Sequence, residues 1–229
     1  MDELLIKLSR CVELGKIDKV SPYPPDMKGQ EGADELTRTA LEQGIKPDDI
    51  LEKSLIPAMA SVGERFSRKE IYVPQMLMAA KAMNGAMKHI KPYFQSGETK
   101  RKGKFIIGTV AGDLHDIGKN LVAMMMEGQG LEIIDAGTDV APERFVELAK
   151  ENDAQIIACS ALLTTTMGEM KSVIEAATAA GIRENVVIMV GGAPVNDTFA
   201  KTIGADIYTP DAASAAEEAI AALKAKGIA

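Results

Sequence analysis

Five short apolar runs alternate with five helical stretches between residues 104 and 226, and this alternation is the strongest constraint on the fold. Short, almost continuously apolar runs are typical of strands buried on both faces, as in a parallel sheet whose crossovers are helices. The predicted strands are 104–110, 131–135, 155–160, 186–191 and 206–208, and the predicted helices are 118–129, 142–151, 166–180, 196–203 and 211–226. The pattern therefore predicts a five-stranded, parallel α/β domain.

The connections of this sheet predict where a ligand binds. We expect a doubly wound, Rossmann-like domain with flavodoxin-like strand order, in which the order reverses beside the first strand. In such sheets ligands bind in the crevice outside the carboxyl ends of the strands. Functional side chains are therefore sought in the loops that follow each predicted strand.

The first part of the chain has a different, helical rhythm. Pro47 and two acidic residues open a helix, and Pro57 inside its apolar repeat predicts a kink. Further apolar stripes predict helices near 4–12, 35–43 and 74–90. We expect a four-helix bundle as an N-terminal cap domain over 1–92, a linker over 93–103 and the α/β domain over 104–229.

Composition excludes several classes of protein. The formal net charge is −7 without a Lys/Arg-rich stripe, so nucleic acid is not an expected partner. No apolar run reaches the ~18 to 20 residues of a membrane span, and residues 1–20 lack the pattern of a secretory signal. Cys11 and Cys159 form no CxxC pair or disulfide framework. The expected location is the cytoplasm, and the oligomeric state stays open.

One of the two histidines follows the first predicted strand, in the run Asp113-Leu114-His115-Asp116-Ile117-Gly118. Imidazole is the commonest protein ligand of metals, and a carboxylate on its other nitrogen fixes the tautomer and orientation. Gly118 allows a ligand or a helix to approach closely. His115 is therefore a candidate axial metal ligand that Asp113 orients.

The other strand ends carry small, hydroxylated or flexible residues. A serine, an apolar leucine and several hydroxyls after the third strand suit a slot for a flat, partly polar group. The candidates are Ser160, Leu162, Thr164, Thr166, Gly191, Gly192, Ala193, Tyr208 and Asp211. Each also has a structural explanation, as a helix cap, a tight turn or core packing. Their convergence on one edge of the sheet favours a binding site.

Together these motifs resemble a known family. Asp113-x-His115-x-x-Gly118, Ser160-x-Leu162 and Gly191-Gly192 are similar to the cobalamin-binding signature of base-off/His-on corrinoid proteins. The helical part resembles the cap module of methyl-carrying corrinoid proteins in the runs 62–67 and 72–75. The similarity extends to the corrinoid subunits of methanol, methylamine and methoxyarene methyltransferase systems and to the cobalamin region of methionine synthase.

The resemblance implies a cofactor and roles for the residues that hold it. The cofactor is a cobalamin, alternating between methylcobalamin and cob(I)alamin, with His115 replacing its dimethylbenzimidazole as the lower cobalt ligand. Asp113 then binds the other ring nitrogen, and Thr166 extends the relay towards solvent. The displaced nucleotide tail enters the slot at Ser160, Leu162, Thr164, Gly191 and Gly192, with Ala193, Tyr208 and Asp211 nearby.

The implied function is that of a non-catalytic carrier subunit in a methyltransferase system. It takes a methyl group from a donor through a substrate-specific methyltransferase and yields it, through an acceptor methyltransferase, to tetrahydrofolate or a thiol. A reductive-activation protein is a third expected partner. The donor stays open between methoxylated aromatics, methylamines, methanol and betaines.

Within the cap, Tyr72 and Met76 are predicted to cover the upper face of the cofactor, with bundle-core packing as the alternative for Met76. The loop over 21–32 is longer and richer in proline than the family pattern, which leaves open how the first helices pack.

Three other functions compete with the carrier hypothesis. One is the cobalamin subunit of an adenosylcobalamin mutase, although the cap favours methyl chemistry. A second is a cobalamin-dependent regulator, for which the chain lacks a basic recognition helix. The third is a phosphate-binding domain, but the stretch 112–120 is one residue too long for a P-loop and has Asn120 in place of Ser/Thr.

Overall fold

The computed structural model describes residues 3–95 and 102–227, which divide into a helical unit and an α/β unit. The α/β unit contains one parallel sheet in the order β2-β1-β3-β4-β5. Its strands are β1 (Lys104–Val110), β2 (Glu132–Val140), β3 (Ile156–Ser160), β4 (Val187–Gly191) and β5 (Ile207–Tyr208). The order reverses between β1 and β3, which confirms the predicted flavodoxin-like arrangement.

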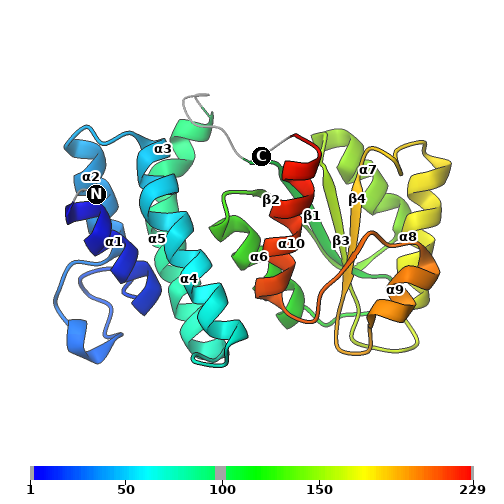
Figure 1. Ribbon diagram of the computed structural model, residues 1–229, viewed down its shortest axis with the longest axis horizontal. Helices are drawn as coiled ribbons and strands as arrows, with labels where there is room; N and C mark the ends of the chain where they lie inside the picture. Colours follow the sequence, from blue (N-terminus) through cyan, green and yellow to red (C-terminus); the bar gives the residue numbers. More distant parts are fainter. Residues whose placement is uncertain (1–2, 96–101, 228–229) are drawn as a thin grey trace. The chain divides into compact units, whose positions relative to one another are not determined.

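Helices cover both faces of this sheet, as a doubly wound fold requires. Figure 1 shows α6 and α10 on one face and α7 and α8 on the other. The helices are α6 (Ile117–Gly128), α7 (Pro142–Asn152), α8 (Gly168–Ala179), α9 (Asp197–Ile203) and α10 (Ala212–Ala225). Their predicted boundaries are correct to within two residues.

Strand β2 departs from the prediction, because it continues to Val140 and not to residue 135. The sequence Ala136-Gly137-Thr138-Asp139 contains residues typical of turns. The predicted strand therefore ends at residue 135. In the structure the strand passes through two irregularities of register, and Gly137 and Asp139 adopt positive φ there.

The core beneath the candidate site lies between the sheet and α7, α8 and α9. Phe145 of α7 is fully buried, and its ring would lie 2.7 Å from a Cβ atom at Gly108 of β1. Glycine at that position therefore allows α7 to approach the sheet closely. The buried cluster includes Ile106, Val110, Phe145, Ile157, Met170, Val173, Ile188 and Val190. This packing positions the ends of β1, β3 and β4 relative to one another.

The helical unit contains four helical segments among its described residues, which agrees with the predicted bundle. They are α1 (Glu3–Leu14), α2 (Ala33–Glu42), the interrupted helix formed by α3 (Pro47–Ile50), η2 (Leu51–Leu55) and α4 (Ile56–Ser67), and α5 (Val73–Gln95). A short 3₁₀ turn, η1 (Pro25–Met27), lies in the proline-rich loop.

The interruption near Pro57 takes a form that the sequence did not predict. The segment η2 is π-helical, and Pro57 follows it in the first turn of α4. The hydroxyl of Ser54, on the π-helical segment, donates to the carbonyl of Leu5 on α1 (2.9 Å).

The predicted linker over 93–103 coincides only partly with described residues. Helix α5 runs through Pro92 to Gln95, so it occupies the first three linker positions, and 96–101 lies outside the described residues. The boundaries at 92 and 104 stay predictions.

Both cysteines are free and buried, and burial raises the pKa of Cys159 to about 12. No helix within 3–95 or 102–227 is long and apolar enough to cross a membrane.

Candidate functional site

The carboxyl ends of β1, β3 and β4 meet at one edge of the sheet. Ser160 pairs with Thr109 of β1 on one side and with Gly191 of β4 on the other. The loops after these three strands therefore begin at the same level. The predicted candidates at 113–118, 160–166 and 191–193 all lie at this edge.

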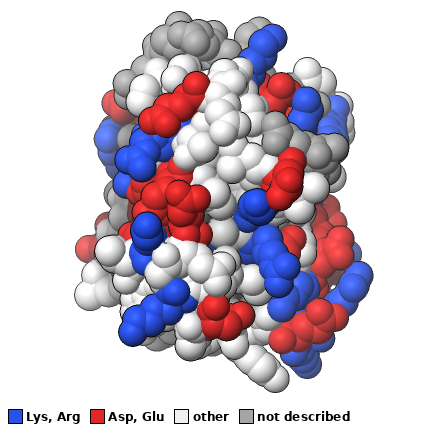
Figure 2. Space-filling model, turned by 90° about the vertical axis from the view of Figure 1, so that its left-hand side faces the viewer, with Lys and Arg blue, Asp and Glu red and all other residues white. Residues whose placement is uncertain are grey.

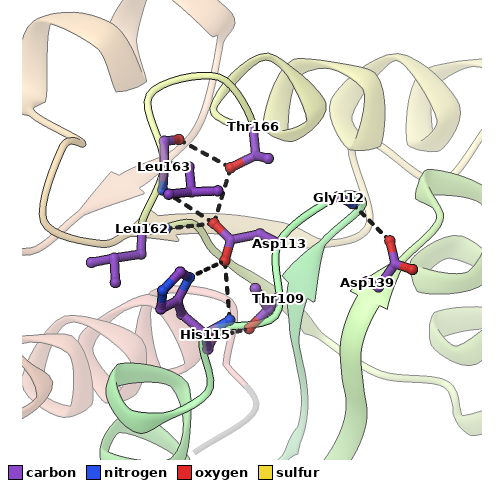
Figure 3. A network of polar contacts seen from close by, with 8 residues as sticks. All are labelled: Thr109, Gly112, Asp113, His115, Asp139, Leu162, Leu163 and Thr166. Atoms are coloured by element: carbon purple, nitrogen blue, oxygen red, sulfur yellow. Dashed lines mark hydrogen bonds and ion pairs between the residues drawn. The ribbon is translucent and has the colours of Figure 1, made fainter.

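Asp113 is the centre of the polar network at this edge (Figure 3). Its side chain is fully buried. One carboxylate oxygen, Oδ1, accepts from the His115 ring Nδ1 (2.8 Å) and the His115 amide (3.1 Å). The other, Oδ2, accepts from the amides of Leu162 (2.7 Å) and Leu163 (3.2 Å) and from the Thr166 hydroxyl (2.9 Å). One side chain thus joins the loop after β1 to the loop after β3.

The hydrogen bonds keep this buried carboxyl group ionised. Burial by itself raises the pKa of Asp113, but the bonds from the His115 amide and ring and from the Leu162 and Leu163 amides outweigh it. The pKa therefore lies well below its ordinary range. Because an ionised carboxylate can only accept, the hydrogen between the two side chains lies on Nδ1 of His115.

His115 presents its remaining ring nitrogen outward. Its side chain is 51% exposed, although Asp113 beneath it is buried. The Thr109 hydroxyl donates to the His115 carbonyl (2.8 Å), so the backbone of this residue is held as well as its ring. With the hydrogen on Nδ1, Nε2 carries the lone pair that a metal ion can accept.

Exposed apolar side chains lie on the loops after β1 and β3, which Asp113 joins. Leu114 is 73% exposed and Ile117 74%, and Leu162 and Leu163 are also exposed. These are four of the eight large apolar side chains that are exposed within the described residues. Their concentration beside a half-exposed histidine is typical of a binding surface for a large, flat, partly apolar group.

The glycines at the same edge leave space for such a group. A Cβ atom at Gly118 would meet nothing within 4 Å, and one at Gly191 would meet only the Thr209 carbonyl at 3.7 Å. Gly192 has a different role, because its φ of +134° suits glycine alone and a Cβ there would lie 1.8 Å from the Ala161 carbonyl oxygen. Gly192 therefore brings the loops after β3 and β4 together.

The remaining predicted residues also lie at this edge, and Asp211 and Asp116 make hydrogen bonds within the protein there. Asp211 caps α10 by accepting from the amides of Ala213 (3.0 Å) and Ser214 (2.9 Å). Asp116 accepts from the Asn120 side chain (3.1 Å). Ser160 and Tyr208 are half-buried, while Thr164 and Ala193 are exposed. Their contact with a cofactor stays a prediction.

The two predicted cap residues lie in the helical unit. Tyr72, which precedes α5, is 65% exposed, and Met76 in its first turn is 1% exposed. Their place over a cofactor stays a prediction.

Figure 2 shows charges of both signs interspersed on one face of the molecule.

Three features of the network were missed by the sequence analysis. They are the Thr109 hydroxyl, the Leu163 amide and Asp139, which accepts from the Gly112 amide (2.7 Å). A backbone amide has no sequence signal. Asp139 had a weak one, since an aspartate two residues after a glycine suggested only a turn.

The donor set suits a metal that brings most of its own ligands. Within 3–95 and 102–227 no group of three or more His, Cys, Asp or Glu side chains could hold a metal ion. His115 would offer such a metal a single nitrogen, and a macrocycle would supply the others. The exposed apolar side chains on the loops after β1 and β3 and the open positions at Gly118 and Gly191 fit a corrin ring and its nucleotide tail.

An orienting carboxylate, one outward imidazole and an apolar surface at the switch point together define a cobalamin-binding α/β protein. The comparisons agree with this description. A B12 binding domain model matches residues 103–223, and a second B12 binding domain model matches residues 29–91 in the helical unit. The chain belongs to the B12-binding family of corrinoid proteins, and its cofactor is a corrinoid.

Individual relatives cover most of the chain. Trimethylamine corrinoid protein 1 of Methanosarcina acetivorans is 46% identical over 181 residues, covering 78% of this chain and 84% of the relative. Dimethylamine corrinoid protein 1 of the same organism is 38% identical over 95% of this chain and 96% of its own length. Among solved structures, the methanol:cobalamin methyltransferase complex MtaBC of Methanosarcina barkeri matches with a TM-score of 0.81 and 28% identity, over 97% of this chain and 80% of that chain.

Proposed function

We propose that this protein carries methyl groups on a corrinoid whose lower ligand is His115. The observation that supports this most is the 2.8 Å contact between His115 Nδ1 and the fully buried Asp113. When bound, the corrinoid supplies a cobalt centre that takes up and gives away a methyl group. The protein supplies a ligand that can bind that centre or leave it.

The residues around His115 suit a ligand of this kind. Asp113 holds the hydrogen at Nδ1, which keeps the Nε2 lone pair directed outward. If the imidazole leaves the metal, its contact with Asp113 still holds the ring in the same orientation. Thr166, hydrogen-bonded to Asp113 at 2.9 Å, extends this network. His115 can therefore be bound to the metal or released from it while the loop that carries it keeps its hydrogen bonds.

His115→Ala is expected to abolish the absorption spectrum of the His-on cofactor while leaving weaker corrinoid binding. The loss in affinity should be about tenfold or more, because even partners that only orient a ligand contribute that much. The measurement is a titration of the apo protein with hydroxocobalamin, followed by absorption spectroscopy. His89→Ala is the matched control, since His89 pairs with Asp34 in the helical unit (2.9 Å). An unchanged spectrum in His115→Ala overturns the ligand assignment.

We propose methylated amines as the class of donor. Relatives named for trimethylamine and dimethylamine are 46% and 38% identical, whereas the methanol complex is 28% identical. The methyl group is proposed to arrive through an amine-specific methyltransferase. It leaves through an acceptor methyltransferase, to tetrahydrofolate or a thiol, after a reductive-activation protein has prepared the cofactor.

The donor proposal predicts a preference among methyltransferases. The corrinoid-loaded, reduced protein is incubated with isotopically labelled trimethylamine, dimethylamine or methanol, each with its own purified methyltransferase. Label on the cofactor, measured by mass spectrometry, should arrive from an amine at least about tenfold faster than from methanol. That ratio corresponds to about 1.4 kcal/mol of discrimination between partner surfaces. Faster labelling from methanol contradicts the proposal.

A further inference from the structure

The end of β2 has an irregular backbone beside the candidate site. Its pairing with β1 shifts register between Ile107 and Gly108 and again between Gly108 and Val110. Within this irregular stretch Gly137 has a φ of 91° and Asp139 a φ of 54°. Irregularities of this kind occur next to functional sites, where they redirect one side chain. Asp139 is the residue with a Cβ atom at positive φ in this stretch.

Asp139 contacts the loop that carries His115 through two separate bonds. Its carboxylate Oδ1 accepts from the Gly112 amide at 2.7 Å (Figure 3). Its own amide donates to the Asp113 carbonyl at 2.9 Å. The two bonds hold both ends of the Gly112–Asp113 dipeptide from the β2 side. The Asp113 side chain is held from the opposite side by the loop after β3.

The backbone of Asp139 indicates that these bonds matter. A residue with a Cβ atom at positive φ is strained by about 1 to 2 kcal/mol, although aspartate tolerates it better than most. Strain of this kind persists where surrounding contacts determine the conformation. At Asp139 the contacts that hold this conformation are the hydrogen bonds to Gly112 and Asp113.

We infer that Asp139 is a positioning residue for the lower ligand. By holding the Gly112–Asp113 backbone, it directs the Asp113 carboxylate towards the His115 ring and so sets the ring's direction. This inference rests on the proposed role of His115 as the cobalt ligand. Its role is indirect, because Asp139 bonds to Gly112 and Asp113 and not to the imidazole.

Three substitutions separate the hydrogen bond from the backbone strain. Asp139→Asn keeps an acceptor oxygen and tolerates positive φ. Asp139→Gly removes the acceptor but relieves the strain, and Asp139→Ala removes the acceptor and keeps the strain. Asp153→Ala is the matched control, because Asp153 ends α7 at a φ of 51° between α7 and β3, at the opposite edge of the sheet.

The first readout needs no cofactor. Hydrogen exchange of the Gly112 amide in the apo protein, followed by NMR, should accelerate on the order of tenfold in the alanine and glycine variants. It should stay near the wild-type rate in Asp139→Asn and Asp153→Ala. An unchanged rate in the alanine and glycine variants overturns the inference.

The second readout is the His-on fraction of the corrinoid-loaded protein, measured by absorption. We expect this fraction to fall several-fold in Asp139→Ala and Asp139→Gly alike and to be retained in Asp139→Asn and Asp153→Ala. If the wild-type protein is His-on and the alanine and glycine variants are equally so, the positioning role is wrong. If the wild-type protein itself is not His-on, the ligand assignment fails instead, so the two failures are distinguishable.

Discussion

Asp113→Ala is expected to lower the free energy of unfolding of the apo protein by about 3 kcal/mol. The substitution removes a buried acceptor shared by the His115 ring, the backbone amides of the adjacent loops and the Thr166 hydroxyl. It also frees the imidazole to rotate, so the His-on spectrum should be lost. Urea denaturation followed by circular dichroism measures the first effect, and corrinoid titration the second.

The stability effect should depend on pH in a defined direction. The folded-state pKa of Asp113 lies below its unfolded value of about 3.9, so its contribution is fully present above that value. It is lost as the pH falls towards the lower folded-state pKa. The contribution of the Asp113 carboxyl group to the difference between the wild-type and Asp113→Ala proteins should therefore shrink below about pH 4.

Asp113→Asn tests charge at nearly constant size. An amide nitrogen must face either the His115 side or the Leu162 side, where donors already point, so destabilisation should persist. Asp197→Ala, which removes an exposed partner of Lys201 on α9, is the control and should change stability by less than about 0.5 kcal/mol. Equal stability of Asp113→Ala and the wild-type protein would contradict the network described above.

Gly192→Ala is expected to destabilise the apo protein by roughly 3 kcal/mol or more, since it combines a forbidden backbone angle with a steric clash. The new Cβ atom would lie 1.8 Å from the Ala161 carbonyl oxygen. Relief requires the loop after β3 to move, and the adjacent Leu162 amide is a donor to Asp113. Corrinoid binding should weaken together with stability. Urea denaturation and hydroxocobalamin titration measure the two effects.

The neighbouring glycine provides a matched comparison. A Cβ atom at Gly191 would make only an ordinary contact, at 3.7 Å from the Thr209 carbonyl. Gly191→Ala should therefore leave stability within about 0.5 kcal/mol of the wild-type value. If the nucleotide tail occupies this space, the same variant should still weaken corrinoid binding. Equal stability losses at positions 191 and 192 would refute the steric account.

The sequence predicted most of the sheet because strand and helix periodicity were strong and agreed with each other. Alternation with helices indicates that β1, β3 and β4 are parallel, and parallel strands bring Asp113, Ser160 and Gly191 to one edge of the sheet. His115 could be singled out because histidine is rare in this chain and follows a strand. The partnership of Asp113 with His115 was predicted from their spacing alone.

Other features had no signal that sequence reasoning could use. The extension of β2 to Val140 depends on two residues at positive φ that locally resemble a turn. The π-helical form of η2 had no signal in the sequence, and Pro57 indicated only that the helix is disturbed. Likewise the role of Gly192 as a point of close approach emerges only when the Ala161 carbonyl lies beside it.

The most direct test of the central claim is electron paramagnetic resonance of the protein loaded with cob(II)alamin. The protein is prepared with histidine of natural abundance and with ¹⁵N-histidine. Because ¹⁴N and ¹⁵N differ in nuclear spin, a histidine nitrogen on cobalt should split each line into a triplet in the first sample and a doublet in the second. His115→Ala should lose this splitting, whereas His89→Ala should retain it. A triplet that persists with ¹⁵N-histidine would mean that the cofactor's own base is the ligand, which contradicts the account.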